Sequence, residues 1–163
     1  SLQTKEQPQI KTIEYSPEKL DELVKAIQST FNESADWARA RISEYSQSKR
    51  HIILAVKNDQ IVGFIFIDDG DDDERVANLT KIDDLGSIPW IAVLPNQRKQ
   101  NIGTILLNEA EKYLSRLGKK GFVLDCNEDK AEFYKKNGYQ YAGSFERQEN
   151  DPPISQAVMF KRI

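Results

Sequence analysis

The sequence contains one cysteine, one histidine and one methionine among 163 residues. The single cysteine, Cys126, excludes a disulfide within the chain and is typical of a reducing compartment. With so few cysteines and histidines, a zinc site lacks ligands, and nucleophilic catalysis by a Ser-His or Cys-His pair is disfavoured. We therefore expect no metal site and no covalent enzyme intermediate.

Long apolar runs and an N-terminal secretion signal are also missing. No apolar run approaches the roughly 20 residues that span a bilayer. Lysine and arginine number 23 against 26 aspartate and glutamate, which gives a formal net charge of −3. This balance does not favour DNA or RNA as a partner. These features predict a cytoplasmic protein that binds neither a membrane nor nucleic acid.

The length and the periodicity of the chain predict a single α/β domain. One domain over residues 1–163 is expected, with a flexible polar segment at 1–9. The stretch 70–86 is polar and is expected to be a loop insert. Apolar spacing and turn residues predict the remaining elements. The strands are expected at 9–15, 51–56, 61–67, 88–94, 121–126, 139–145 and 156–163, and the helices after Ser16 and at 32–45, 97–117 and 129–137.

The most informative stretch runs from Ile91 to Leu107, where an apolar strand ends at Pro95 and a helix begins after a short polar turn. The first turn of a helix has unpaired N–H groups and carries partial positive charge. Arg98 and Lys99 add full positive charge there. This combination predicts a binding site for an anion such as a phosphate.

A second motif makes the turn more specific. It is Asn127-Glu-Asp-Lys-Ala-Glu-Phe-Tyr-Lys-Lys-Asn-Gly-Tyr139. Together with the turn, in this order and at this separation, it resembles the GCN5-related N-acetyltransferase (GNAT) family. The matching part runs from about Ile88 to Phe145. The resemblance implies a mixed, mostly antiparallel α/β sheet of six to seven strands, with helices on both faces and a parallel, splayed strand pair near the cofactor.

The family's acetyl-CoA loop reads Arg/Gln-x-x-Gly-x-Gly/Ala, and this chain has Asn101 where the family usually has its first glycine. Asparagine tolerates a positive φ better than other non-glycine residues, so we expect the turn to form. The ordinary alternative is a strand-to-helix turn with a basic helix start. The resemblance implies that the following residues cradle the pyrophosphate of acetyl-CoA: Arg98, Lys99, Gln100, Asn101, Ile102, Gly103 and Thr104.

The resemblance also assigns roles around the thioester. Backbone groups of Ile91, Ala92 and Val93 are expected to pair with the pantetheine arm and to polarise the thioester carbonyl. Asn127 matches a family asparagine that hydrogen-bonds the cofactor, although a helix N-cap is an equal alternative. Tyr134 is expected to be the general acid that reprotonates the leaving thiolate. Its alternative role is that of a core aromatic residue.

No general base is apparent. The strand before the turn carries no carboxylate, whereas many family members have a glutamate there. Asp83, Asp84 and Asp125 are candidate substitutes, although a solvated surface position is more typical of each, and water-mediated deprotonation is the default. The acidic run 68–74 could attract a cationic amine or could be a solvated loop. Three aromatic residues could line an acceptor pocket, although core packing is more typical for most of them: Trp37, Tyr45 and Trp90.

We interpret the chain as an N-acetyltransferase that uses acetyl-CoA as co-substrate. The amine acceptor, a small molecule or a peptide, is expected to attack the thioester directly in a ternary complex. A CoA-binding sensor of the same fold with little turnover is the main alternative. A nucleotide-phosphate binder ranks lower, because the sequence lacks a Gly-x-x-x-x-Gly-Lys-Ser/Thr motif. Edge strands of the sheet are compatible with a homodimer.

Overall fold

The computed structural model describes residues 9–70 and 73–163 and contains a seven-stranded sheet over that part of the chain. Residues 1–8 and 71–72 lie outside the described residues, and with them most of the expected flexible segment 1–9 and the middle of the acidic run. Within the described residues, no helix is long and apolar enough to cross a membrane.

The strand order along the sheet is β1-β2-β3-β4-β5-β7-β6, and all neighbours are antiparallel except β4 and β5. This confirms the expected mixed, mostly antiparallel sheet with one parallel pair. β1 and β6 form its two edges. The strands are β1 (Ile10–Glu14), β2 (Arg50–Lys57), β3 (Gln60–Asp68), β4 (Leu85–Val93), β5 (Gly121–Asn127), β6 (Gln140–Arg147) and β7 (Ile154–Arg162).

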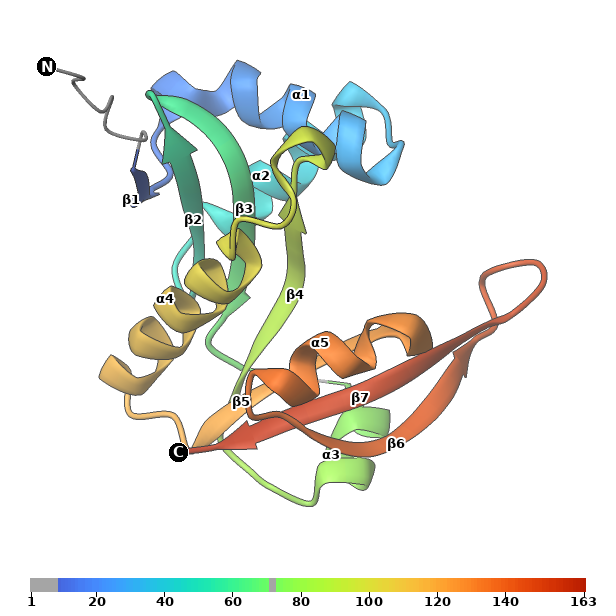
Figure 1. Cartoon of the computed structure of the whole chain (residues 1–163). Helices are drawn as coiled ribbons and strands as arrows, with labels where there is room; N and C mark the ends of the chain where they lie inside the picture. Colours follow the sequence, from blue (N-terminus) through green and yellow to red (C-terminus); the bar gives the residue numbers. More distant parts are fainter. Residues whose placement is uncertain (1–8, 71–72) are drawn as a thin grey trace, which may run out of the picture.

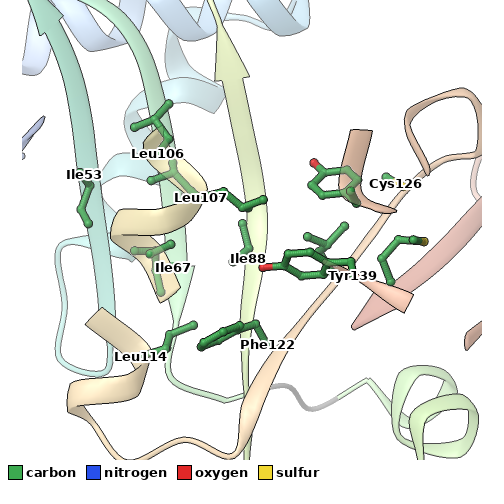
Figure 2. Packing of buried hydrophobic residues seen from close by; sticks show 14 of the residues in the cluster. Ile53, Ile67, Ile88, Leu106, Leu107, Leu114, Phe122, Cys126 and Tyr139 are labelled. Atoms are coloured by element: carbon green, nitrogen blue, oxygen red, sulfur yellow. The ribbon is translucent and has the colours of Figure 1, made fainter. Parts of the chain in front are cut away.

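Helices cover both faces of the sheet, as expected. α4 and α5 pack on one face, where a large apolar cluster joins them to β2–β5 and β7, as Figure 2 shows for part of this cluster. α1 and α2 pack on the other face against β2 and β3, and α3 packs there against β5 and β7. The helices are α1 (Leu20–Phe31), α2 (Ala35–Tyr45), α3 (Glu74–Thr80), α4 (Ile102–Arg116) and α5 (Ala131–Lys136), with short 3-10 helices at Pro17–Lys19, Pro95–Gln97 and Glu128–Lys130.

The parallel strands β4 and β5 pair only at their beginnings and then diverge. Their last paired residues are Ser87 and Val123. Beyond this point β4 continues beside β3 while β5 continues beside β7, so the two halves of the sheet open into a fork (Figure 1). The fork leaves one edge of β4 without a strand partner.

A β-bulge accompanies the divergence. Phe66 pairs with Trp90, and Asp68 pairs with Ser87, so three steps along β4 match two along β3. Pro89 lies inside the bulge. A strand accepts proline at a bulge because the missing N–H group is not needed there for a hydrogen bond to the neighbouring strand. The bulged strand bends, and the bend lies where β4 separates from β5.

Two expected boundaries were wrong. The insert 70–86 is not only a loop: it contains α3, whose N-cap Asp73 accepts a hydrogen bond from the Arg75 N–H, and β4 begins at Leu85. The helix expected from Gln97 begins at Ile102, because Pro95–Gln97 forms a separate 3-10 helix.

Candidate functional site

A cavity of about 660 Å³ lies at the fork, between the N-terminal end of α4 and α5. We call it the first cavity. Eleven of the twelve residues expected around acetyl-CoA line it, and only Gln100 does not. Its lining also includes residues that the sequence interpretation missed. The full lining is Thr30, Phe31, Ile91, Ala92, Val93, Arg98, Lys99, Asn101, Ile102, Gly103, Thr104, Asn127, Lys130, Phe133 and Tyr134.

Gln100 is turned toward its neighbours on the protein surface. Its Nε2 donates to the Gln97 Oε1 at 3.1 Å, and its Oε1 accepts from the Lys57 Nζ at 3.1 Å. These contacts hold its side chain outside the cavity. A role for Gln100 toward the cofactor therefore rests on its backbone.

The turn adopts the conformation expected of it. Asn101 has φ 64° and ψ 17°, in the left-handed region, and its side chain makes no capping hydrogen bond to α4. Lys99 also has a positive φ, of 69°. The prediction of a positive φ at Asn101 is confirmed. Since a helix leaves its first N–H groups without intrahelical partners, the start of α4 offers donors at the cavity wall.

Gly103 allows α4 and α5 to approach each other. A Cβ atom added there would lie 3.0 Å from the Phe133 Cζ atom, closer than ordinary contact. Phe133 thus forms a wall of the cavity over the first turn of α4. Lys130 precedes Tyr134 by four residues, a spacing that brings side chains to one side of a helical segment. This spacing is the sequence signal that could have identified Lys130.

Positive charge gathers at this cavity without compensation. Arg98, Lys99 and Lys130 line it, and no aspartate or glutamate does. Among residues 9–70 and 73–163, none of these three cations forms an ion pair, although most arginines of the described chain do. A cavity wall with unpaired cations attracts an anionic ligand.

β4 presents its unpaired edge to the same cavity. Ile91, Ala92 and Val93 pair with β3 on one side. The pairing of β4 with β5 has already ended at Ser87. Backbone groups that point to this side have no strand partner and are available to an extended ligand.

Tyr134 lines the cavity with only 7% of its surface exposed. No hydrogen bond within the described part of the chain uses its hydroxyl group. Burial, and then the charges of Cys126 and Asp125, raise its pKa above the ordinary value of 10.0. The hydroxyl therefore stays protonated at physiological pH, as a proton donor must.

Asn127 does not act as a helix cap. Its backbone is extended before the 3-10 helix Glu128–Lys130, but its side chain forms no capping hydrogen bond. Its Oδ1 instead accepts a hydrogen bond of 2.6 Å from the Gln156 Nε2. Asn127 thus occupies the N-cap position without capping the helix through its side chain, and it lines the first cavity.

The second cavity, of about 190 Å³, lies at the closed end of the fork beside the N-terminal end of α3. Three carboxylates line it, and each is bound by an arginine: Asp68 by Arg50 at 3.0 Å, Asp73 by Arg75 at 2.9 Å and Asp125 by Arg147 at 2.6 Å. The lining is Asp68, Gly70, Asp73, Ser87, Ile88, Pro89, Leu124 and Asp125.

The candidate bases differ in position. Asp83 and Asp84 are exposed and pair with Lys120 and Lys119, outside both cavities. Their solvated surface role is confirmed. Asp125 is half-buried at the fork and is the candidate that lies beside the diverging strands.

Other residues singled out in the sequence have core positions. Trp37 and Trp90 pack edge to face with ring centroids 5.7 Å apart, and Tyr45 packs on Trp90 at 5.3 Å. Cys126 is buried, and burial raises its thiol pKa to about 12. A thiol with this pKa is a poor nucleophile at neutral pH. In the described ranges, no group of His, Cys, Asp and Glu could hold a metal ion.

Comparisons with known proteins agree with this geometry. The sequence model of the acetyltransferase (GNAT) domain matches residues 48–141. The uncharacterized N-acetyltransferase YjcF of Bacillus subtilis (strain 168) is 29% identical over 103 residues, which cover 63% of this chain and 64% of YjcF. The matched part is thus just under two thirds of that relative's length.

Solved structures share the fold. Arabidopsis thaliana NAA60 in complex with acetyl-CoA has a TM-score of 0.77 at 16% identity, over 95% of this chain and 99% of that one. An aminoglycoside 6'-N-acetyltransferase complexed with coenzyme A has a TM-score of 0.75 at 21% identity, over 93% and 96%. Acetyl-CoA is the co-substrate typical of this fold family, and the first cavity, with its unpaired cations, fits such an anion. The chain belongs to the GNAT family of acetyltransferases.

Proposed function

We propose that this chain transfers the acetyl group of acetyl-CoA to a primary amine by direct attack in a ternary complex, and that residues 1–163 act as one catalytic domain. The observation that carries the proposal is the first cavity. It combines three cations that have no ion-pair partner in the described part of the chain, the start of α4, the free edge of β4 and a buried, protonated tyrosine.

Each part of that cavity has a role in the proposed reaction. The turn before α4, with Arg98, Lys99 and Lys130 around it, binds the phosphates of CoA. Backbone N–H groups of Ile91 to Val93 bind the pantetheine arm and stabilise the oxyanion of the tetrahedral intermediate. When the intermediate collapses, the C–S bond breaks and the Tyr134 hydroxyl gives its proton to the departing thiolate.

The amine must lose a proton before or during attack. The half-buried Asp125 at the fork is a candidate acceptor of that proton, directly or through water. Its carboxylate forms an ion pair of 2.6 Å with Arg147.

Ligand binding followed by thiol release tests the proposal. CoA and acetyl-CoA should raise the melting temperature in a thermal shift assay, whereas ATP and NAD should not. Acetyl-CoA with a panel of amines should then release free thiol only in the presence of an accepted amine. Stabilisation by ATP but by neither CoA species would refute the acetyltransferase proposal.

A CoA-binding sensor is the second candidate function. It is favoured by one observation, namely that no carboxylate lines the first cavity among the residues described. CoA binding without thiol release across small amines, polyamines and peptides would support the sensor over the enzyme.

A further inference from the structure

Gln156 is a buried polar residue directly beside the first cavity. It lies on β7 with 7% of its surface exposed and pairs in register with Asn127 at the end of β5. Opposite residues of an antiparallel pair point to the same face. The two amide side chains therefore meet, and only Asn127 reaches the cavity lining.

The hydrogen bonds of Gln156 determine which way both amides point. Its Nε2 donates to the Asn127 Oδ1 at 2.6 Å and to the backbone carbonyl of Ser155 at 3.3 Å. A carbonyl oxygen can only accept, so the Ser155 contact fixes the nitrogen of Gln156 on this side. The Asn127 oxygen must then be the acceptor of the shorter bond.

This arrangement leaves the Asn127 Nδ2 unused. No hydrogen bond within residues 9–70 and 73–163 involves its two N–H groups. Because Asn127 is an exposed residue at the cavity wall, these donors are free for a ligand. At this point the cavity wall thus offers the Asn127 Nδ2 as a donor. The Asn127 Oδ1 is already occupied by the hydrogen bond from Gln156.

We propose that Gln156 is a positioning residue that holds Asn127 with its Nδ2 toward the bound cofactor, where it donates to an amide carbonyl of the pantetheine arm. The inference rests on the proposed function, because it assumes that acyl-CoA occupies the first cavity. Without Gln156, the Asn127 amide can rotate and present its oxygen instead, and an oxygen repels a carbonyl.

Gln156→Glu tests the polarity of the contact with almost no change in size. A carboxylate at this position accepts only, so it requires the Asn127 Nδ2 and turns the Asn127 oxygen toward the cavity. Calorimetric titration should show about a tenfold weaker Kd for CoA. Adenosine 3',5'-bisphosphate, which lacks the pantetheine arm, should bind with unchanged affinity. Gln156→Leu provides a second variant that removes the contact without adding a charge.

A double-mutant cycle separates positioning from general loss of structure. In the Asn127→Ala background, Gln156→Glu and Gln156→Leu should have no further effect on the CoA Kd. Equal weakening of CoA and adenosine 3',5'-bisphosphate, an unchanged Kd for CoA, or full additivity in the cycle would each overturn the inference. Failure of the wild-type protein to bind CoA would instead refute the proposed function.

Discussion

The two cavities at the fork have opposite charge and opposite states of pairing. The first is lined by Arg98, Lys99 and Lys130, none of which has an ion-pair partner in the described chain. The second is lined by three carboxylates, and each is bound by an arginine. Unpaired charge is ready to bind a ligand, whereas paired charge already stabilises the fold. From this comparison we expect the first cavity to contribute more to ligand affinity than the second.

The cavities also differ in how they are assembled. Most of the first cavity comes from two short sequence stretches, 91–104 and 127–134. The second collects residues from β3, the segment before α3, β4 and β5. A site built from contiguous residues leaves a motif in the sequence, and a site gathered from distant strands does not.

The largest expected effect is at Tyr134, in the lining of the first cavity. Tyr134→Phe removes the proton donor and should lower kcat roughly 100-fold, while the Kd for CoA changes by less than about twofold. Because the hydroxyl has no hydrogen-bond partner in the described residues, the melting temperature should stay close to that of the wild type. Steady-state thiol release and calorimetric titration measure the two quantities.

Tyr139→Phe is the matched control for that variant. Tyr139 donates to the Glu111 carboxylate at 3.1 Å within the core, so its loss should lower stability without a comparable loss of kcat. An unchanged kcat in Tyr134→Phe would remove Tyr134 from the acid role.

Charge removal in the first cavity should have the next largest effect. Lys130→Gln should weaken CoA binding about tenfold at low salt, because a charge-assisted contact to phosphate is lost, and the difference should shrink as salt is added. Lys136→Gln, at an exposed position at the end of the adjoining helix α5 and outside the cavity lining, is the control. Equal effects of the two substitutions would contradict a specific contact.

Charge removal in the second cavity should have a smaller effect on a different parameter. Asp125→Asn should raise the KM for the amine about fivefold and leave the Kd for CoA unchanged, because its charge is already shared with Arg147. Asp83→Asn, on the surface, should change neither constant. A loss of CoA affinity in Asp125→Asn would contradict the expectation that the first cavity binds CoA and the second cavity binds the amine.

The smallest effect is expected in the turn itself. Asn101→Gly keeps the left-handed conformation without strain and should change the Kd for CoA by less than about threefold, toward tighter binding. Asn101→Ala places alanine at φ 64°, in the left-handed region that asparagine tolerates better than alanine does. This substitution should lower the free energy of unfolding by about 1 kcal/mol. Chemical denaturation and titration measure both. A large loss of CoA affinity in Asn101→Gly would show that the asparagine side chain itself binds the ligand.

Sequence reasoning was most successful where neighbours along the chain determine the structure. The positive φ at Asn101 follows from the turn between β4 and α4, and Gly118, which follows α4, has φ 80° as the ending of that helix requires. The fold class and eleven of the fifteen residues that line the first cavity were also predicted through the family resemblance. These features depend on local backbone preferences and on two contiguous motifs.

The sequence alone failed where distant segments meet. The sequence left a capping role and a cofactor-binding role for Asn127 as an even choice, and it could not show that the register of β5 with β7 places Gln156 beside this residue. Thr30 and Phe31 reach the first cavity from α1 without any local signal. The sequence thus determined most of the helices and strands and the conformation of the turn before α4. Only the tertiary structure decided which charges are paired and which face a cavity, because pairing depends on strand register and helix packing between residues far apart in the chain.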